Sequence, residues 1–314
     1  MLSRNAQGVY WLGRYLERAD LLCRMMKEQV GALVDRPVEE INFAWRRLFA
    51  CMQYTPAGGL FNVASDNFTQ ADSFTLAGET TFEEGNPNSL TACIRMGREN
   101  ARQMRNCISA EMWTSLNLSY LKFLDSDIVS IWRRSPEAFF DETSRDLRSF
   151  FGIAHATMYR DEAWLFLQLG RAVERAQGSV SLLLAQVAEE TKLETGLEYG
   201  LESLLAIFEA RETYRRRFGF DVASERVREL LVTDPRLPNS IRQSTDAAFE
   251  NLNKMGPAPD GDFEMPLRIA GRTCSLVRYE WPDVDDRRKL LKEISEGTRQ
   301  IHASVEKGFF HNSN

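Results

Sequence analysis

The sequence predicts an all-α protein, an elongated multi-helix bundle built from two related halves. A six-residue pattern, Gly-Arg-x-x-Glu-Arg, occupies residues 13–18 and 170–175, which are 157 positions apart in a chain of 314. Apolar residues recur every three or four positions around both copies, the spacing of one buried face of a long helix. Runs of β-branched residues with the two-residue period of a strand are absent. We therefore expect one all-helical domain over 1–314, with halves at roughly 1–157 and 158–314.

The apolar faces of the two long helices correspond position by position. The first face consists of Val9, Leu12, Leu16, Ala19, Cys23, Met26, Val30 and Leu33. The positions 157 residues later are Phe166, Leu169, Val173, Ala176, Val180, Leu183, Val187 and Glu190. The repeat therefore holds until its last position. A second repeated signature agrees with the first, because Pro-Asn-Ser occurs at 87–89 and again at 238–240, where each serine can cap the start of a helix.

The other elements follow from helical periodicity and from the cap and turn residues between periodic stretches. We predict helices at roughly 4–34, 38–54, 89–110, 112–125, 136–184 (with a break near 159–161), 192–217, 222–232, 239–254, 264–281 and 284–308. The segment 55–88 is the longest non-helical candidate. It carries Phe61, Phe68, Phe74 and Phe82, which favour a loop packed over the body of the protein.

Composition excludes several classes of function. The net charge is −6 at pH 7, so the overall charge favours neither nucleic acid nor an anionic membrane as a partner. No run of about 18 apolar residues is present, and the first residues lack the apolar stretch of a signal peptide, so we expect a cytoplasmic protein. The five cysteines form no C-x-x-C pair and only three histidines occur, so we predict a reduced environment and no metal or cofactor site.

The charged residues of the repeated pattern share their helix face with large side chains such as Tyr10 and Trp11, which predicts an inner helix packed against several neighbours. A buried charge without a partner costs several kcal/mol, so these residues need partners. A related pattern, Gly-Arg-x-x-x-Arg, occurs at 97–102. The candidate ligand-binding residues are Arg14, Glu17, Arg18, Arg98, Glu99, Asn100, Arg102, Arg171, Glu174 and Arg175.

Two interpretations of these residues compete. In the structural one, bidentate Arg–Glu pairs between helices fix the register of the bundle. In the functional one, the arginines line a basic interior cleft and hold a carboxylate or phosphate, while the glutamates orient them. Spacing alone favours the structural interpretation, because ion-pair networks are common in helical proteins. The chain has no Gly-rich phosphate loop, no G-x-S-x-G and no H-E-x-x-H, so no catalytic residue is assigned.

Several segments together resemble the bacterial alpha-E family, which is named for its helical content and its Glu-Arg motif. The resemblance rests on Tyr-Trp-Leu-Gly-Arg-Tyr-Leu-Glu-Arg-Ala at 10–19, Arg-Glu-Asn-Ala-Arg at 98–102, Leu-Gly-Arg at 169–171 and Glu-Arg-Ala at 174–176. Residues 109–113, 214–217 and 234–240 also resemble the family, so the likeness covers nearly the whole chain. The second copy departs from the first by Gln168 in place of Trp11, so the two surroundings are not expected to be equivalent.

The resemblance implies a function through partners. Members of the family are typically encoded beside, or fused to, a circularly permuted ATP-grasp ligase, often with a transglutaminase-like peptidase and sometimes with a proteasome-like peptidase. The chain is then an accessory, non-catalytic component of an amide-ligase system that makes or modifies peptides, and it binds a carboxylated amino acid, a peptide or the ligase. Two alternatives stay open. One is a free-standing enzyme with a glutamate as general base in an Arg-lined cleft, and the other is a purely structural scaffold.

Overall fold

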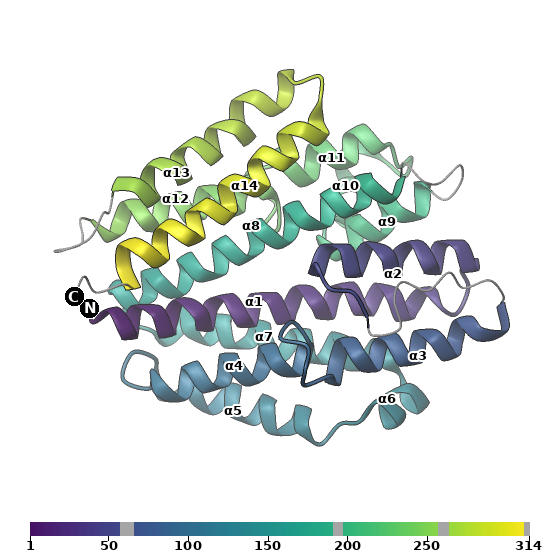
Figure 1. Ribbon diagram of the computed structural model, residues 1–314, viewed down its shortest axis with the longest axis horizontal. Coiled ribbons are helices and arrows are strands. Elements are labelled where there is room, and N and C mark those ends of the chain that lie inside the picture. Colours follow the sequence, from purple (N-terminus) through teal and green to yellow (C-terminus); the bar gives the residue numbers. More distant parts are fainter. Residues whose placement is uncertain (57–65, 191–196, 257–263, 311–314) are drawn as a thin grey trace.

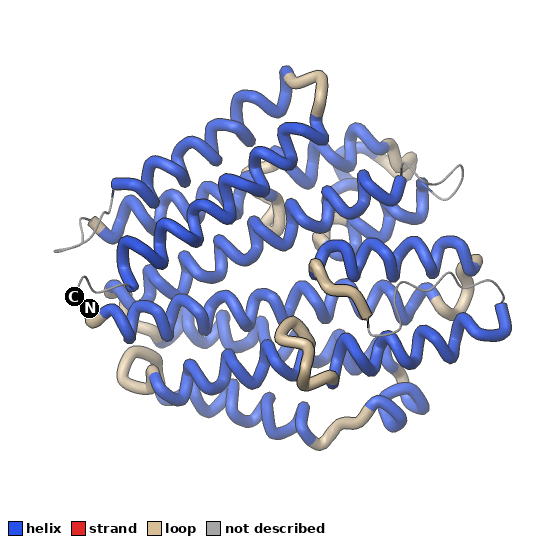
Figure 2. Tube along the Cα trace, viewed as in Figure 1, coloured by secondary structure: helices blue, strands red, loops and turns tan. Residues whose placement is uncertain are grey.

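The computed structural model describes residues 1–56, 66–190, 197–256 and 264–310. Within these ranges every regular element is a helix, as Figure 2 shows, which confirms the all-α prediction. The α-helices are α1 (Ser3–Ala32), α2 (Val38–Met52), α3 (Asp66–Phe82), α4 (Leu90–Gln103), α5 (Ala110–Leu124), α6 (Ile128–Arg134), α7 (Pro136–Thr157), α8 (Glu162–Glu190), α9 (Leu197–Ile207), α10 (Arg211–Phe218), α11 (Ser224–Thr233), α12 (Ile241–Met255), α13 (Glu264–Ser275) and α14 (Arg287–Val305). Short turns of π-helix or 3-10 helix follow the last two: η1 (Leu276–Glu280), η2 (Trp281–Asp283) and η3 (Glu306–Phe310).

The prediction that 55–88 is non-helical is wrong for residues 66–82, which form α3. Its Ser, Thr and Gly residues have weak helix propensity, so packing against neighbouring helices stabilises it instead. The indole Nε1 of Trp45 on α2 donates to Ser73 Oγ at 3.0 Å, and the rings of Phe82 and Phe123 stack at 5.7 Å. Phe74 contacts Trp132 of α6, a second helix that was not predicted from the sequence. Phe61 and the side chain of Phe68 lie outside the described residues.

Two other predicted helices are divided in the structure. The predicted stretch 136–184 is α7 followed by α8, with the break where it was expected, and α8 begins where Asp161 accepts the backbone N–H of Ala163 at 3.0 Å. Residues 192–217 were predicted as a single helix, but they contain α9 and α10. The backbone turns between these two helices at Glu209, whose φ of 55° is the left-handed conformation that interrupts a right-handed helix.

The two longest helices, α1 and α8, run side by side through the middle of the molecule (Figure 1). Helices α4 and α7 pack on α1, and α5 packs on both of them. Helices α12 and α14 pack on α8, and α13 packs on both of those. Helix α2 and the α9–α11 group gather at one end, while η3 returns to α1 at the other. Among the described helices, none offers a stretch with the length and apolarity needed to span a bilayer.

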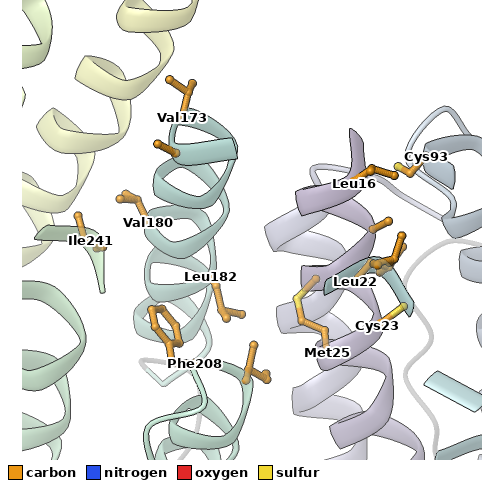
Figure 3. Close-up of a cluster of buried hydrophobic side chains, with 14 of the residues drawn as sticks. Leu16, Leu22, Cys23, Met25, Cys93, Val173, Val180, Leu182, Phe208 and Ile241 are labelled. Carbon is orange, nitrogen blue, oxygen red and sulfur yellow. The ribbon is translucent and has the colours of Figure 1, made fainter. Parts of the chain in front are cut away.

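The predicted apolar faces of α1 and α8 form the centre of one hydrophobic core that both halves share. All of their members are buried except Leu33, Val187 and Glu190, which lie near the ends of the helices. Figure 3 shows Leu16 of α1 pointing toward Cys93 of α4, and Val180 of α8 pointing toward Ile241 of α12. Each central helix therefore buries part of its apolar face against its own satellite helices.

The glycines of the repeated pattern allow α1 and α8 to approach closely. A Cβ on Gly170 would lie 2.1 Å from the carbonyl oxygen of Tyr10, and a Cβ on Gly13 would lie 2.4 Å from that of Leu167. Both obstructing atoms belong to the backbone, so no side-chain rotation relieves the clash. The glycine at the first position of each pattern is therefore required by the helix crossing.

We predict that Gly170→Ala destabilises the protein by about 2 kcal/mol or more, because the overpacking penalty exceeds the gain in helix propensity. Gly152→Ala is the matched control, since Gly152 lies on the exposed side of α7 with no atom within 4 Å of its added Cβ. That variant is expected to be about 0.5–1 kcal/mol more stable than the parent. Urea unfolding of the three proteins measures both effects, and equal stability of the two variants would contradict the close crossing.

Candidate functional site

The charged residues of the two patterns meet where α1 lies against α8, and they pair between the helices. Glu174 of α8 receives both arginines of α1: Arg14 Nε donates to its Oε2 at 2.6 Å, and Arg18 Nε donates to its Oε1 at 2.6 Å. Arg18 Nη2 adds a bond to Oε2 at 3.1 Å. Both carboxylate oxygens are therefore occupied by guanidinium groups of the opposite helix, and Arg18 binds them with the paired geometry typical of the strongest ion pairs.

The second carboxylate, Glu17, has the same arrangement with the two helices exchanged. Glu17 of α1 accepts Arg171 Nε at 2.9 Å and Arg175 Nε at 2.6 Å, and Arg175 Nη2 adds a bond at 2.9 Å. Six of the ten predicted site residues thus come together in two reciprocal sets. Within each set, the glutamate comes from one helix and both arginines from the other.

Both glutamates are ionised at neutral pH. Burial alone raises the pKa of Glu174, but the positive charges of Arg14 and Arg18 outweigh it and lower the pKa to about 2. Burial likewise raises the pKa of Glu17, while Arg175 and Arg171 lower it to about 2. A carboxylate with so low a pKa is a weak base, so neither glutamate is suited to accept a proton from a substrate.

The two sets differ in their surroundings, as Gln168 in place of Trp11 predicts. The guanidinium of Arg14 lies 4.8 Å from the Trp11 ring, and its side chain is only 4% exposed. Arg14 Nη2 donates to Gln177 at 2.6 Å, while its buried Nη1 has no hydrogen-bond acceptor among the described residues. Arg171 instead lies 4.2 Å from the ring of Phe151 and is 28% exposed. The prediction of unequal surroundings is confirmed.

The second repeated signature contacts the first. Asn88 Oδ1 accepts Arg18 Nη1 at 3.0 Å, and the carbonyl oxygen of Pro238 accepts Arg175 Nη1 at 3.1 Å. The serines that follow cap helices as predicted: Ser89 accepts the N–H of Ala92 at the start of α4, and Ser240 accepts that of Gln243 at the start of α12. The sequence predicts only helix caps for these segments, although their recurrence in both halves is a signal that could have placed them at the site.

A pocket of about 240 Å³ lies beside the Arg18–Glu174 pair. Its apolar wall comes from α1 and α2 and consists of Leu21, Leu22, Met25, Cys51 and Met52. Its polar lining comes from four separate segments and consists of Gln53, Asn88, Gln177, Ser181, Ser295 and Thr298. Arg18 and Arg299 are its cationic residues and Glu174 is its anionic one. Ligand pockets for drug-sized molecules measure about 300–1,000 Å³, so this one suits a smaller group.

Arg18 has donors left for a ligand in this pocket. A guanidinium carries five N–H groups, and Arg18 uses three of them on Glu174 and Asn88. The other two find no acceptor among the described residues, and 26% of the side chain is exposed. Both oxygens of Glu174 already accept hydrogen bonds, so this carboxylate does not use the two remaining N–H groups of Arg18. Those N–H groups can therefore bind a ligand in the pocket. This arrangement is chemically suited to bind an anionic oxygen pair.

The arginines of α4 lie outside these two sets. Arg98 Nε donates to Asn117 of α5 at 2.9 Å, and its guanidinium lies 4.8 Å from the ring of Tyr120. Arg102 pairs with Glu99 one turn away at 2.6 Å on the surface. Asn100 is half-buried on the same helix. These four predicted residues therefore hold α4 against α5 or face solvent, and none of them lines the pocket.

Residues outside the ten predicted ones also line the site. His302 of α14 hydrogen-bonds the hydroxyl of Tyr10 through Nδ1 at 3.1 Å, and its ring meets Trp11 edge-on at 5.3 Å. Burial and then the charge of Arg14 lower the pKa of His302 to about 4, so this imidazole is neutral at pH 7. Because α14 is far from α1 in sequence and has no repeated pattern, no local signal places His302 or Arg299 here.

A family model, described as a predicted α-helical domain with a conserved ER motif, matches residues 1–310. The chain belongs to the Alpha-E family. Relatives are uncharacterised proteins of Mycobacterium bovis and Mycobacterium tuberculosis, each 23% identical over 320 residues. These matches cover 96% of this chain but 35% of each relative, so the Alpha-E chain spans about a third of the length of the curated relatives it matches. No solved structure matches it.

We predict that the paired glutamates make this Alpha-E protein sensitive to acid. Their pKa values fall from an ordinary 4.5 to about 2 on folding, so the stability they contribute is present above pH 4.5 and is lost as the pH falls toward 2. Glu174→Gln is expected to lower the free energy of unfolding by about 3–5 kcal/mol at pH 7, because it leaves Arg14 and Arg18 without a counter-charge. The difference from the parent should shrink as the pH falls.

Urea unfolding between pH 3 and pH 7 measures this dependence. The control is Glu280→Gln, which removes an exposed glutamate at the end of η1 and is expected to behave like the parent at every pH. A constant difference between Glu174→Gln and the parent across the whole range would show that Glu174 contributes nothing through its charge.

Proposed function

We propose that this Alpha-E chain is an accessory, non-catalytic component of an ATP-grasp amide-ligase system. In this proposal, the pocket beside Arg18 holds a carboxylate-bearing amino acid or peptide on which the system acts. Family membership supports the role, and so does the length of the mycobacterial relatives, in which the matching region is joined to a longer polypeptide. If the catalytic residues are on another domain or protein, this domain needs only a site that binds the ligand.

The observation that carries the proposal is the state of Arg18. Its side chain lines the pocket, is held in place by Glu174 and Asn88, and keeps two N–H groups without acceptors among the described residues. A guanidinium fixed in this way loses little conformational entropy when a carboxylate binds to it. The apolar wall beside it, which includes Leu21 and Met25, offers contact for the rest of a small ligand.

The same geometry argues against the two alternatives. A free-standing enzyme with a glutamate base requires a carboxylate of raised pKa, whereas Glu17, Glu99 and Glu174 all have pKa values lowered to about 2. A purely structural scaffold accounts for Arg14 and both buried glutamates, because these residues have partners within the fold. It does not account for an arginine with spare donors at the wall of a pocket.

We also propose that the chain arose by internal duplication of an ancestral half. The two Gly-Arg-x-x-Glu-Arg patterns exchange partners reciprocally, and the two Pro-Asn-Ser segments begin α4 and α12, which pack on α1 and α8 respectively. The second half diverges, because Arg175 is 14% exposed against 26% for Arg18 and Trp11 has no equivalent there, which leaves the Arg18 side as the ligand site.

We predict that the chain binds N-acetyl-leucine, a carboxylate with an apolar side chain, and that Ser181→Phe lowers the affinity at least about tenfold. Ser181 lines the pocket but takes no part in the Arg–Glu pairs, so a phenylalanine there fills the space and leaves the ion pairs intact. Ser275→Phe, on the exposed side of α13, is the matched control and should bind normally. Isothermal titration calorimetry gives each affinity, and binding by Ser181→Phe equal to that of the parent would place the ligand elsewhere.

We also expect the tagged chain, purified from its native host, to bring an ATP-grasp ligase with it in stoichiometric amount. Mass spectrometry of the co-purified proteins provides the measurement, with an untagged strain as control. Recovery of no ligase from a host that expresses one would remove the partnership from the proposal while leaving the pocket to be tested on its own.

A further inference from the structure

The pocket continues along α1 as a stripe of aromatic side chains. Trp11, Tyr15 and Arg18 are spaced four and three residues apart, so they lie on one face of the helix, and all three are partly exposed. The rings of Trp11 and Tyr15 are 5.2 Å apart, and the guanidinium of Arg18 lies 5.9 Å from the ring of Tyr15. Together the three side chains form a continuous surface, which we call the aromatic stripe, that ends at the pocket.

The length of the aromatic stripe corresponds to a short peptide. Arg18 follows Trp11 by seven positions on the helix, which at about 1.5 Å per residue is about 10 Å along the axis. An extended peptide advances about 3.3 Å per residue, so about three of its residues match that length. Aromatic faces make favourable contact with many kinds of side chain, so such a surface tolerates variation in sequence.

The positively charged residues near the aromatic stripe favour a ligand with a negatively charged end. The buried guanidinium of Arg14 lies against Trp11, and Arg18 and Arg299 stand at the pocket. The positive potential of Arg14 reaches His302, which touches Trp11, because this charge is the second cause, after burial, that lowers the pKa of the imidazole. Glu306 lies 3.6 Å from His302 Nε2 and partly offsets this potential at the far end, away from the pocket.

The pocket itself discriminates between a free amino acid and the end of a peptide. A free amino acid carries an ammonium group, which needs a carboxylate partner. Among the described residues, Glu174 is the only carboxylate that lines the pocket, and both of its oxygens already accept hydrogen bonds from arginines. Placing an ammonium beside Arg18 and Arg299 is therefore unfavourable. In a peptide the same nitrogen is a neutral amide.

We propose that the pocket and the aromatic stripe together bind the last three residues of a peptide with a free C-terminal carboxylate. This inference rests on the proposed function and names its ligand class. The carboxylate binds the spare N–H groups of Arg18, and an apolar last side chain packs against Leu21 and Met25. The two preceding residues extend across Tyr15 and Trp11. The chain thereby selects the end of a peptide and leaves the rest of it outside the site.

The test is calorimetric titration of the full chain with four ligands: acetyl-Ala-Ala-Leu, its C-terminal amide, N-acetyl-leucine and leucine. We expect the peptide acid to bind at least about tenfold more tightly than N-acetyl-leucine and at least about tenfold more tightly than its amide, with leucine the weakest of the three carboxylates. These comparisons use the unmodified protein, so they do not depend on the folding of any variant.

A variant tests the stripe. Tyr15→Leu should lower the affinity for acetyl-Ala-Ala-Leu to that for N-acetyl-leucine and leave the latter unchanged. Tyr120→Leu is the matched control, since Tyr120 also stacks with an arginine, Arg98, but on α5 away from the pocket. It should bind the peptide as the parent does.

The outcomes separate the inference from the proposed function. If N-acetyl-leucine binds and the peptide acid binds no more tightly, the peptide inference is overturned and the carboxylate pocket stands. Binding of the amide as tightly as the acid, or binding of leucine above N-acetyl-leucine, overturns the inference as well. If none of the three carboxylates binds, the carboxylate pocket of the proposed function falls together with it.

Discussion

The close contact between α1 and α8 determines where the other parts of the site lie. Gly13 and Gly170 let the two backbones approach closely, and at that distance the glutamates of each helix bond directly to the arginines of the other. Burying a charged residue without its partner costs several kcal/mol, whereas the complete set of pairs is stable. The pairing therefore favours the one register of the two helices in which every charge has its partner. Four arginines face two glutamates, and one of the four, Arg18, lines the pocket.

Neutral groups share in holding the arginines. Gln177, Asn88 and the carbonyl of Pro238 each accept one guanidinium N–H, which fixes the side chains without cancelling their charge. In the function we propose, the repeated pattern serves a structural and a binding role at once. The set around Glu17 is the more buried at its carboxylate, and the set around Glu174 borders the pocket.

The sequence predicts those features whose residues lie close together along the chain, and it does not predict those assembled from distant segments. The apolar faces of α1 and α8 extend over about 25 residues, so their periodicity identified both helices and the centre of the core. Helix α3 was missed because its Ser, Thr and Gly residues resemble a loop and its stability depends on contacts such as Trp45 with Ser73. The walls of the pocket come from α1, α2, α8 and α14, so no residue spacing within one segment could have predicted it.

The reciprocal pairs also constrain how the chain folds. Each joins residues 154 to 160 positions apart, so no ion pair of the crossing forms until most of the polypeptide is available. Contacts between residues so distant in sequence carry a large loop-closure entropy and are associated with slow folding. The contacts of α1 and α8 with the segments that begin α4 and α12, such as Arg18 with Asn88 and Ser179 with Asn239, join residues 70 and 60 positions apart, so we expect them to form first. The ion pairs of the central crossing then form after these contacts.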